Sequence, residues 1–156
     1  MEKYIGKSYV TSYNASVIKG LIKDSDPSPT TTYTTKCTSR TMTVSFDKLI
    51  CCKISEATVV FIDDEHTLTF KGVAELDKKK NKIVFLGSFM INRIDPSTGK
   101  EHRGTAHLSI TLDILHDKCY KFKGYYQSWA GLFNFDEETK SRISISDIGS
   151  FYLKRS

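Results

Sequence analysis

The sequence predicts an all-β protein in which antiparallel, up-and-down strands close into a small barrel of about eight to ten strands. Segments with strand-like alternation recur along the chain, turn residues separate them, and helical periodicity is almost absent. The clearest segment is 105–113, where Ala106, Leu108, Ile110 and Leu112 alternate with polar residues. Because successive side chains of a strand point to opposite faces, this segment belongs to a sheet with one dry face.

In the first third of the chain, strands flank a long polar loop. Residues 23–32 contain two prolines among serines, threonines and aspartates and predict this loop. Residues 41–47 predict a strand, because Met42, Val44 and Phe46 alternate with polar side chains. Residues 4–13 predict the first strand, residues 33–37 a threonine-rich strand, and residues 17–22 either a helical turn or an extension of the first strand.

The middle of the chain predicts three further strands joined by polar turns. Residues 57–62 form a β-branched and aromatic run, and residues 66–77 alternate cleanly. Residues 83–91 are apolar at both parities, which predicts a strand covered on both faces. A lysine-rich hairpin loop at 77–81 precedes this strand, and turn chemistry at 95–99 follows it.

The last third predicts strands at 105–113, 120–128 and 150–154. Between the last two, residues 134–146 predict an insertion, whose acidic part fits either a short helix or a loop. Ile143 and Ile145 alternate briefly within it.

Three glycines, Gly72, Gly87 and Gly124, fall inside predicted strands. Glycine weakens a strand unless the sheet bends sharply or packs very closely, as a small barrel requires. The glycines therefore favour a closed barrel over a flat sandwich. The number of strands matches a barrel of lipocalin-like size.

Composition sets the class of protein and its partners. The 156 residues, 39% of them hydrophobic, predict one domain over residues 1–156, and the net charge of +5 favours anionic partners or simple solubility. No apolar signal region opens the chain, and the longest apolar-rich run is too short to span a bilayer. The four cysteines include no CxxC pair, which fits free thiols in a reducing compartment. We expect a cytoplasmic protein without a membrane segment.

Motifs that would predict an enzyme are missing from the sequence. It contains no GxSxG nucleophile elbow, no GxGxxG or GxxxxGK[ST] phosphate loop, and no Cys/His spacing that suits zinc. We therefore expect a non-enzymatic protein with no cofactor and no metal site.

Cationic and aromatic side chains near strand ends predict a ligand site at the mouth of the barrel. Arg103 and Arg142 offer planar guanidinium groups suited to phosphate oxygens. Tyr125 and Trp129 offer rings on which bases can stack, and Trp129 is expected just after a strand end. His107, on the strand 105–113, completes the candidate ligand-binding set. Which strand parity faces the interior stays open.

Short motifs in the second half resemble a known family. The segments Gly104-Thr105-Ala106-His107-Leu108, Lys123-Gly124-Tyr125-Tyr126 and Gly149-Ser150-Phe151-Tyr152-Leu153-Lys154-Arg155 occur in this order. The order resembles the cyclic-nucleotide receptor β-barrel at the C-terminus of two-transmembrane effectors in bacterial CBASS antiviral systems. The resemblance covers about two-thirds of the chain, from roughly Thr41 onward.

The resemblance implies a barrel that binds a cyclic dinucleotide made by a partner nucleotidyltransferase, with oligomerisation on ligand binding. The sequence departs from the family in two ways: no transmembrane helix precedes the barrel, and residues 134–146 are inserted. These departures are compatible with a stand-alone sensor, an excised receptor domain or a phage-side sponge of the signal.

Other functions fit the same barrel. The main alternative is a carrier of a small apolar ligand, in the manner of lipocalins or fatty-acid-binding proteins, which needs an apolar lumen. A protein that binds another protein through a sheet edge or loops is a third hypothesis. DNA is not an expected partner.

Overall fold

A computed structural model describes residues 2–19, 30–34, 39–48, 53–63, 67–94, 101–115, 121–134 and 141–156. Within these ranges, side chains are described except at 14–19, 30–34, 91–94, 101–103, 132–134 and 141–143. The regular elements are all strands: β1 (Glu2–Lys19), β2 (Thr30–Thr34), β3 (Ser39–Phe46), β4 (Ile54–Ile62), β5 (Thr67–Asp77), β6 (Lys82–Ile94), β7 (Glu101–Ile114), β8 (Lys121–Asn134) and β9 (Ser141–Arg155). The predicted all-β class is confirmed.

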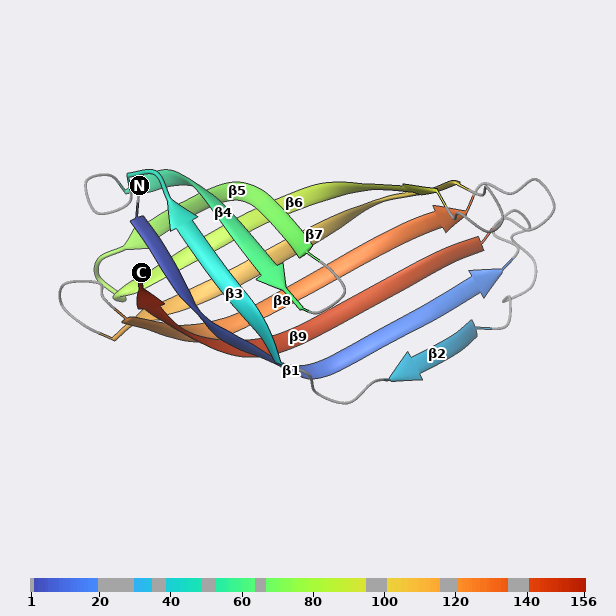
Figure 1. Cartoon of the computed structure of the whole chain (residues 1–156), viewed down its shortest axis with the longest axis horizontal. Coiled ribbons are helices and arrows are strands. Elements are labelled where there is room, and N and C mark those ends of the chain that lie inside the picture. The colour runs from blue at the N-terminus through green and yellow to red at the C-terminus, as the bar shows by residue number, and fades with distance from the viewer. Residues whose placement is uncertain are drawn as a thin grey trace.

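The strands form one antiparallel sheet that closes on itself (Figure 1). Their order is β2-β1-β3-β4-β5-β6-β7-β8-β9, and a further pairing of β1 with β9 closes eight of the nine strands into an up-and-down barrel. The first half of β1 pairs with β3, and the second half pairs with β2 along the same edge. The predicted small closed barrel is therefore confirmed.

The barrel is much longer on one side than on the other. Strands β6 to β9, together with the second half of β1 and with β2, continue past the ends of β3, β4 and β5 as a curved sheet (Figure 1). A β-bulge between Val10 and Ser12 marks the change along β1. The hydroxyl of Thr11, the extra residue, donates to the carbonyl oxygen of Ile148 at 2.9 Å. Such bulges bend a strand, and β1 needs a bend here because it passes from the closed barrel into the open sheet.

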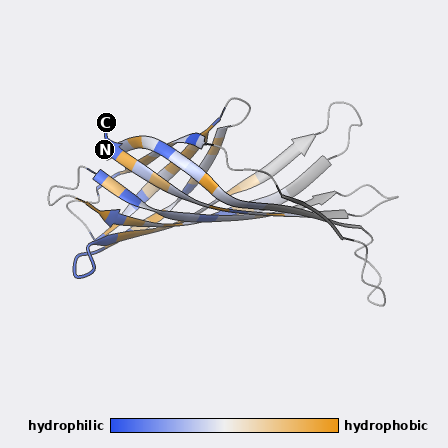
Figure 2. Cartoon of the chain, turned by 90° about the horizontal axis from the view of Figure 1, so that it is seen from below, coloured by the Kyte–Doolittle hydropathy of each residue, from blue (hydrophilic) through white to orange (hydrophobic). Residues whose placement is uncertain are grey.

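The interior of the barrel is filled by its own apolar side chains. Ala106, Leu108, Ile110 and Leu112 are buried, as the alternation in segment 105–113 predicts. At the end where the chain starts and stops, Tyr4 packs edge-to-face against Phe46 and Phe122, with ring centroids 5.8 and 4.6 Å apart. Figure 2 shows hydrophobic and hydrophilic positions alternating along the barrel strands.

Glycine allows two neighbouring strands to approach at a bend. Gly72 of β5 lies in register with Gly87 of β6. A Cβ atom added to Gly72 would lie 1.9 Å from the carbonyl oxygen of Leu86, so no larger residue fits without moving backbone. This close approach gives a physical reason for the glycines inside the predicted strands.

The described side chains of β6 correct one prediction. Ile83 and Phe85 are buried, but Val84, Leu86 and Met90 are 42%, 60% and 86% exposed. The strand therefore has one covered face, and its outer apolar residues face solvent. A run that is apolar at both parities is typical of a doubly covered strand, but here no second layer covers the outer wall within the described residues.

Several predicted boundaries differ from those of the structure. Strand β1 extends to Lys19, so residues 17–19 continue the first strand and are not helical. Thr30–Thr34 forms β2, so this strand begins three residues earlier than the predicted strand 33–37 and includes the last three residues of the predicted loop 23–32. Ser141–Arg155 is one strand, which removes residues 141–146 from the predicted insertion. Asn134 is the last residue of β8, and residues 23–29 and 135–140 of the two loop predictions lie outside the described residues.

Candidate functional site

The mouth of the barrel, where β3 begins and β6 to β9 continue outward, contains a polar layer. Three side chains form it: Arg40 from β3, Tyr126 from β8 and Asp147 from β9. They lie far apart in the sequence, and the barrel brings them together because β3 and β9 both flank β1. Side-chain exposures of 11% for Arg40 and 10% for Asp147 place this layer at the edge of the core.

The three groups are joined by a closed set of hydrogen bonds. One guanidinium nitrogen of Arg40, Nη2, donates to Asp147 Oδ2 and to the hydroxyl oxygen of Tyr126, both at 2.9 Å. The Tyr126 hydroxyl in turn donates to Asp147 Oδ1 at 3.1 Å. Both carboxylate oxygens thus have a donor. A buried charge is tolerated when it is paired and hydrogen-bonded in this way.

Burial dominates the electrostatics of this layer. Desolvation raises the pKa of Asp147 above its ordinary value, against the opposing effects of the Arg40 charge and of the Arg40 and Tyr126 hydrogen bonds. Burial and the neighbouring Asp147 carboxylate likewise raise the pKa of the Tyr126 hydroxyl, although Arg40 opposes the shift. Among the described residues, Arg40 Nε is a buried nitrogen without a hydrogen-bond partner. An unpaired buried donor costs about 1–3 kcal/mol.

Aromatic rings surround the guanidinium group. Its central carbon lies 4.5 Å from the ring centroid of Phe61 and 5.5 Å from that of Tyr126. Phe89, half-buried on β6, packs edge-to-face on Phe70 with ring centroids 4.8 Å apart. Tyr13, also half-buried, lies in register with Asp147. Phe61 and Tyr126 are buried, so the mouth combines one cation with two partly exposed rings, those of Tyr13 and Phe89, and this is the chemistry that a nucleotide requires.

Three of the predicted ligand residues lie on the outer wall of the barrel and not at its mouth. Tyr125 is 69% exposed, Trp129 is 42% exposed, and His107 is exposed. The rings of His107 and Trp129 stack with centroids 5.7 Å apart. Trp129 lies within β8 and not after its end. The prediction that Trp129 follows a strand end is therefore wrong. Trp129 is level with the mouth, because its neighbour Ser128 is in register with Asp147, but its side chain faces outward.

The two predicted arginines come close together in the extended sheet. Arg103 of β7 and Arg142 of β9 are both in register with Phe133 of β8, which lies between them. The side chains of all three lie outside the described residues. The structure thus groups two pairs of the predicted residues, His107 with Trp129 and Arg103 with Arg142, but assigns no shared pocket to them.

Sequence reasoning missed the polar layer. Arg40 and Asp147 were not among the predicted site residues, and Tyr125 was chosen over its neighbour Tyr126. One signal could have corrected the choice of tyrosine: Lys121 and Lys123 share the parity of Tyr125, and lysines seldom face a core. Alternation places Arg40 at the parity of Val44 and Phe46, but no local pattern pairs it with Asp147, because their meeting depends on closure of the barrel.

Comparisons with known families and curated proteins give no match to this chain. Among the described residues, no group of three or more His, Cys, Asp or Glu side chains is placed to hold a metal ion. None of the described residues belongs to a helix that could cross a lipid bilayer.

Proposed function

We propose that this chain is a non-enzymatic binding module for a cyclic dinucleotide, and that the ligand binds at the barrel mouth. The observation that carries the proposal is the position of Arg40. Its guanidinium group lies over an aromatic ring in the last layer of the core, is paired with a single carboxylate, and has a buried Nε without a partner among the described residues. Arginine suits phosphate oxygens, and the half-buried rings of Tyr13 and Phe89 at the mouth suit bases.

Folding stability alone does not explain why an ion pair of Arg40 and Asp147 occupies this layer. Replacing a buried ion pair by packed apolar residues is often neutral or stabilising, because desolvating two charges costs several kcal/mol. A ligand that supplies acceptors to Arg40 gives the charge a role that an apolar layer could not fill. The curved sheet beyond the mouth, formed by β6 to β9 and β1, offers a wall for the rest of the ligand.

The resemblance in the second half of the chain supports the same ligand class. It suggests a role in bacterial antiphage signalling, as a cytoplasmic sensor, an excised receptor domain or a phage-side sponge, with oligomerisation when ligand binds. The predicted arginines Arg103 and Arg142 would then contact the outer part of the ligand, and the stacked pair of His107 and Trp129 would contact a second copy.

The apolar-carrier alternative has less support. A carrier needs an empty apolar lumen, but the described interior is occupied by large side chains such as Phe46, Phe70, Phe85 and Phe122. An apolar ligand would have to lie beyond the mouth, where Arg40 and Asp147 form the floor.

Calorimetric titration with cyclic dinucleotides tests the proposal, with a fluorescent fatty acid as the competing ligand. At a free concentration about a hundred times the dissociation constant, the true ligand should stabilise the protein by about 2.7 kcal/mol. The variant Arg40→Gln/Asp147→Asn removes both charges but keeps hydrogen-bonding groups, and it should lose cyclic dinucleotide binding. Tyr125→Ala is the matched control on the outer wall. Stabilisation by the fatty acid alone, or equal binding by the double variant, would refute the proposal.

A further inference from the structure

The charges of the described side chains are concentrated at one end of the barrel. We call this the lysine end, and it comprises the described turns and the two outermost residues of each strand at the end where β1 begins and β9 stops. It holds ten cationic side chains: Lys3, Lys48, Lys53, Lys78, Lys79, Lys80, Lys82, Lys121, Lys154 and Arg155. Its carboxylates are four: Glu2, Asp47, Asp77 and Asp113.

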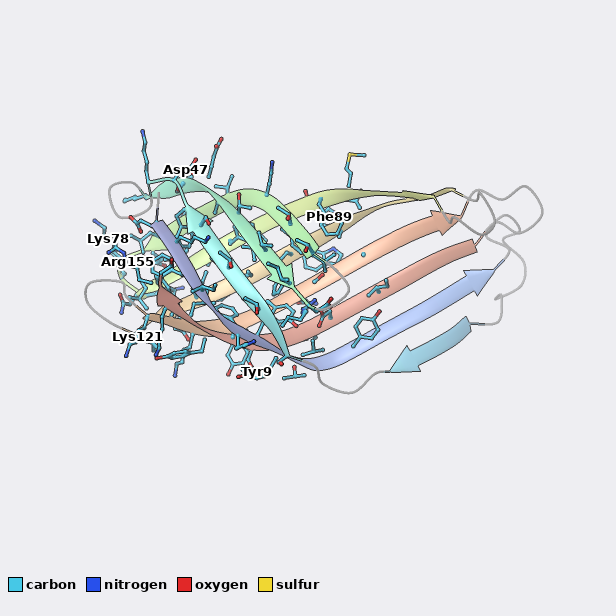
Figure 3. The ribbon with its side chains drawn as sticks, viewed as in Figure 1. Tyr9, Asp47, Lys78, Phe89, Lys121 and Arg155 are labelled. Atoms are coloured by element: carbon cyan, nitrogen blue, oxygen red, sulfur yellow. The ribbon has the colours of Figure 1, made fainter. Side chains whose placement is uncertain are left out.

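Charge is balanced over the rest of the described side chains. There, four cations, Lys7, Arg40, Lys71 and Lys123, stand against four carboxylates, Glu56, Asp63, Glu75 and Asp147. The excess positive charge of the described part of the chain therefore lies at the lysine end. Up-and-down topology produces this concentration, because alternate turns and both outer strand ends meet there. Figure 3 shows Lys78, Lys121 and Arg155 together at this end, with Tyr9 and Phe89 farther along the barrel.

The lysine end contains a hollow of about 460 Å³ beside Lys53, the end of β5 and the turn that follows it. Lys53, Lys78 and Lys79 line it, together with Asp77 and with Glu75, a carboxylate that borders the lysine end as the third residue from the end of β5. The Leu76 amide donates to the carbonyl oxygen of Lys53 at 2.8 Å, which holds Lys53 beside the end of β5. Within the described residues, no ion pair neutralises any of the three lysines.

The hairpin turn that carries three of the lysines is well held. Asp77 Oδ1 accepts hydrogen bonds from the amides of Lys79 and Lys80 at 3.1 and 3.2 Å. Asn81 adopts a positive φ of 56° and donates its side-chain amide to the carbonyl oxygen of Ile114 at 3.1 Å. The carboxylate of Asp77 is therefore engaged by its own turn, and the lysine side chains are left exposed to solvent.

Exposed aliphatic side chains accompany the lysines. Ile54, the first residue of β4, is 60% exposed, and Leu115, just after β7, is 42% exposed. Val84, which also lines the hollow, is 42% exposed. Side chains of this kind can enter the apolar boundary of a bilayer, while lysines around them meet the headgroup phosphates.

We propose that the lysine end is a docking surface for a bilayer that contains anionic phospholipids, with a headgroup phosphate in the hollow beside Lys53, Lys78 and Lys79. Lysine is a compact point charge suited to the diffuse negative potential of such a surface. The mixture of cations and aliphatic residues favours lipid over nucleic acid. The most exposed ring of the described side chains, that of Tyr125, lies on the outer wall instead.

Vesicle cosedimentation tests the proposal, with the protein as it stands. Vesicles that contain about one-third phosphatidylserine should bind the protein at roughly physiological ionic strength, and pure phosphatidylcholine vesicles should not. Binding should fall steeply at high salt. The variant Lys78→Glu/Lys79→Glu/Lys80→Glu keeps the turn residues Asp77 and Asn81 and should weaken binding about a hundredfold or more.

A matched control separates location from net charge. Lys7→Glu/Lys71→Glu changes the total charge by the same amount as the double turn variant Lys78→Glu/Lys79→Glu, but at positions outside the lysine end. Its binding to phosphatidylserine vesicles should fall far less than that of the double turn variant. Equal losses in the two variants, or no preference for phosphatidylserine, would overturn the proposal. So would tighter binding of a single-stranded oligonucleotide that competes with the vesicles. These results are independent of cyclic dinucleotide binding, which depends on the mouth.

Discussion

The two ends of the barrel differ in where their charged side chains lie. At the lysine end, charges stay outside the wall in solvent, and the interior is closed by the rings of Tyr4, Phe46 and Phe122. At the mouth, Arg40 and Asp147 lie inside the wall and are nearly buried. An exposed lysine costs the fold little, whereas a buried pair costs desolvation that its own attraction barely offsets. The comparison shows that the mouth, and not the lysine end, holds an ion pair at the edge of the packed core.

The largest expected effect concerns the aromatic layer of the lysine end. Phe122→Ala removes a fully buried ring that packs on Tyr4, so it should lower the free energy of unfolding by about 3–5 kcal/mol. Urea denaturation measures the change. A loss below about 1 kcal/mol would mean that this end of the barrel is not the packed half.

Next in size is the loss of one partner from the buried pair at the mouth. Arg40→Ala leaves Asp147 buried without its cation, and should cost about 3 kcal/mol in denaturant unfolding. The double variant Arg40→Met/Asp147→Leu removes both charges and should regain most of that loss. If the double variant were as unstable as the single one, the ion pair would be needed for folding, and the contrast between the two ends would fail.

A smaller effect should appear in the pH dependence of stability. Because the pKa of Asp147 is raised in the folded state above 3.8, the folded protein binds this proton more readily than the unfolded chain does. The contribution of Asp147 is thus fully present below the unfolded pKa and is lost as pH rises through the folded pKa. Relative to Asp147→Asn, the natural protein should become less stable over that window. The unfolding free energies of both proteins between about pH 4 and pH 8 test this expectation. A natural protein that became more stable with rising pH relative to Asp147→Asn would contradict it.

The smallest effect is expected on the outer wall. Tyr125→Ala removes a ring that is 69% exposed, so unfolding free energy should change by less than about 0.5 kcal/mol. Ligand binding at the mouth should also be unaffected. A calorimetric titration that lost cyclic dinucleotide affinity in this variant would move the site from the mouth to the outer wall, where the structure places Tyr125.

Local patterns were enough to predict the wall of this barrel. The alternation around Leu108 and Ile110 predicts a strand with one buried face, and the structure has that strand and buries that face. Glycines inside strands predict close approach, and Gly72 meets the backbone of β6. Such features depend on neighbours in the sequence or on pairing between adjacent strands, so they can be read without knowing the fold.

Selection of the site needed more than local pattern. Tyr125 and Tyr126 are adjacent and chemically alike, and only the parity of the strand sends one to solvent and the other to the core. Arg40 and Asp147 carry no motif at all. Arg40 shares the parity of the buried residues Val44 and Phe46, and Asp147 shares that of Phe151 and Leu153, but neither residue predicts the other.

The amino-acid sequence alone therefore determined the all-β class, the strands and most of the buried face, because period-two alternation and turn chemistry act over a few residues. Closure of β1 against β9 brought Arg40 to Asp147 and gathered the lysines of separate turns at one end. Contacts between residues more than a hundred positions apart follow from the way the sheet closes, and the local alternation of side chains does not determine which distant residues meet.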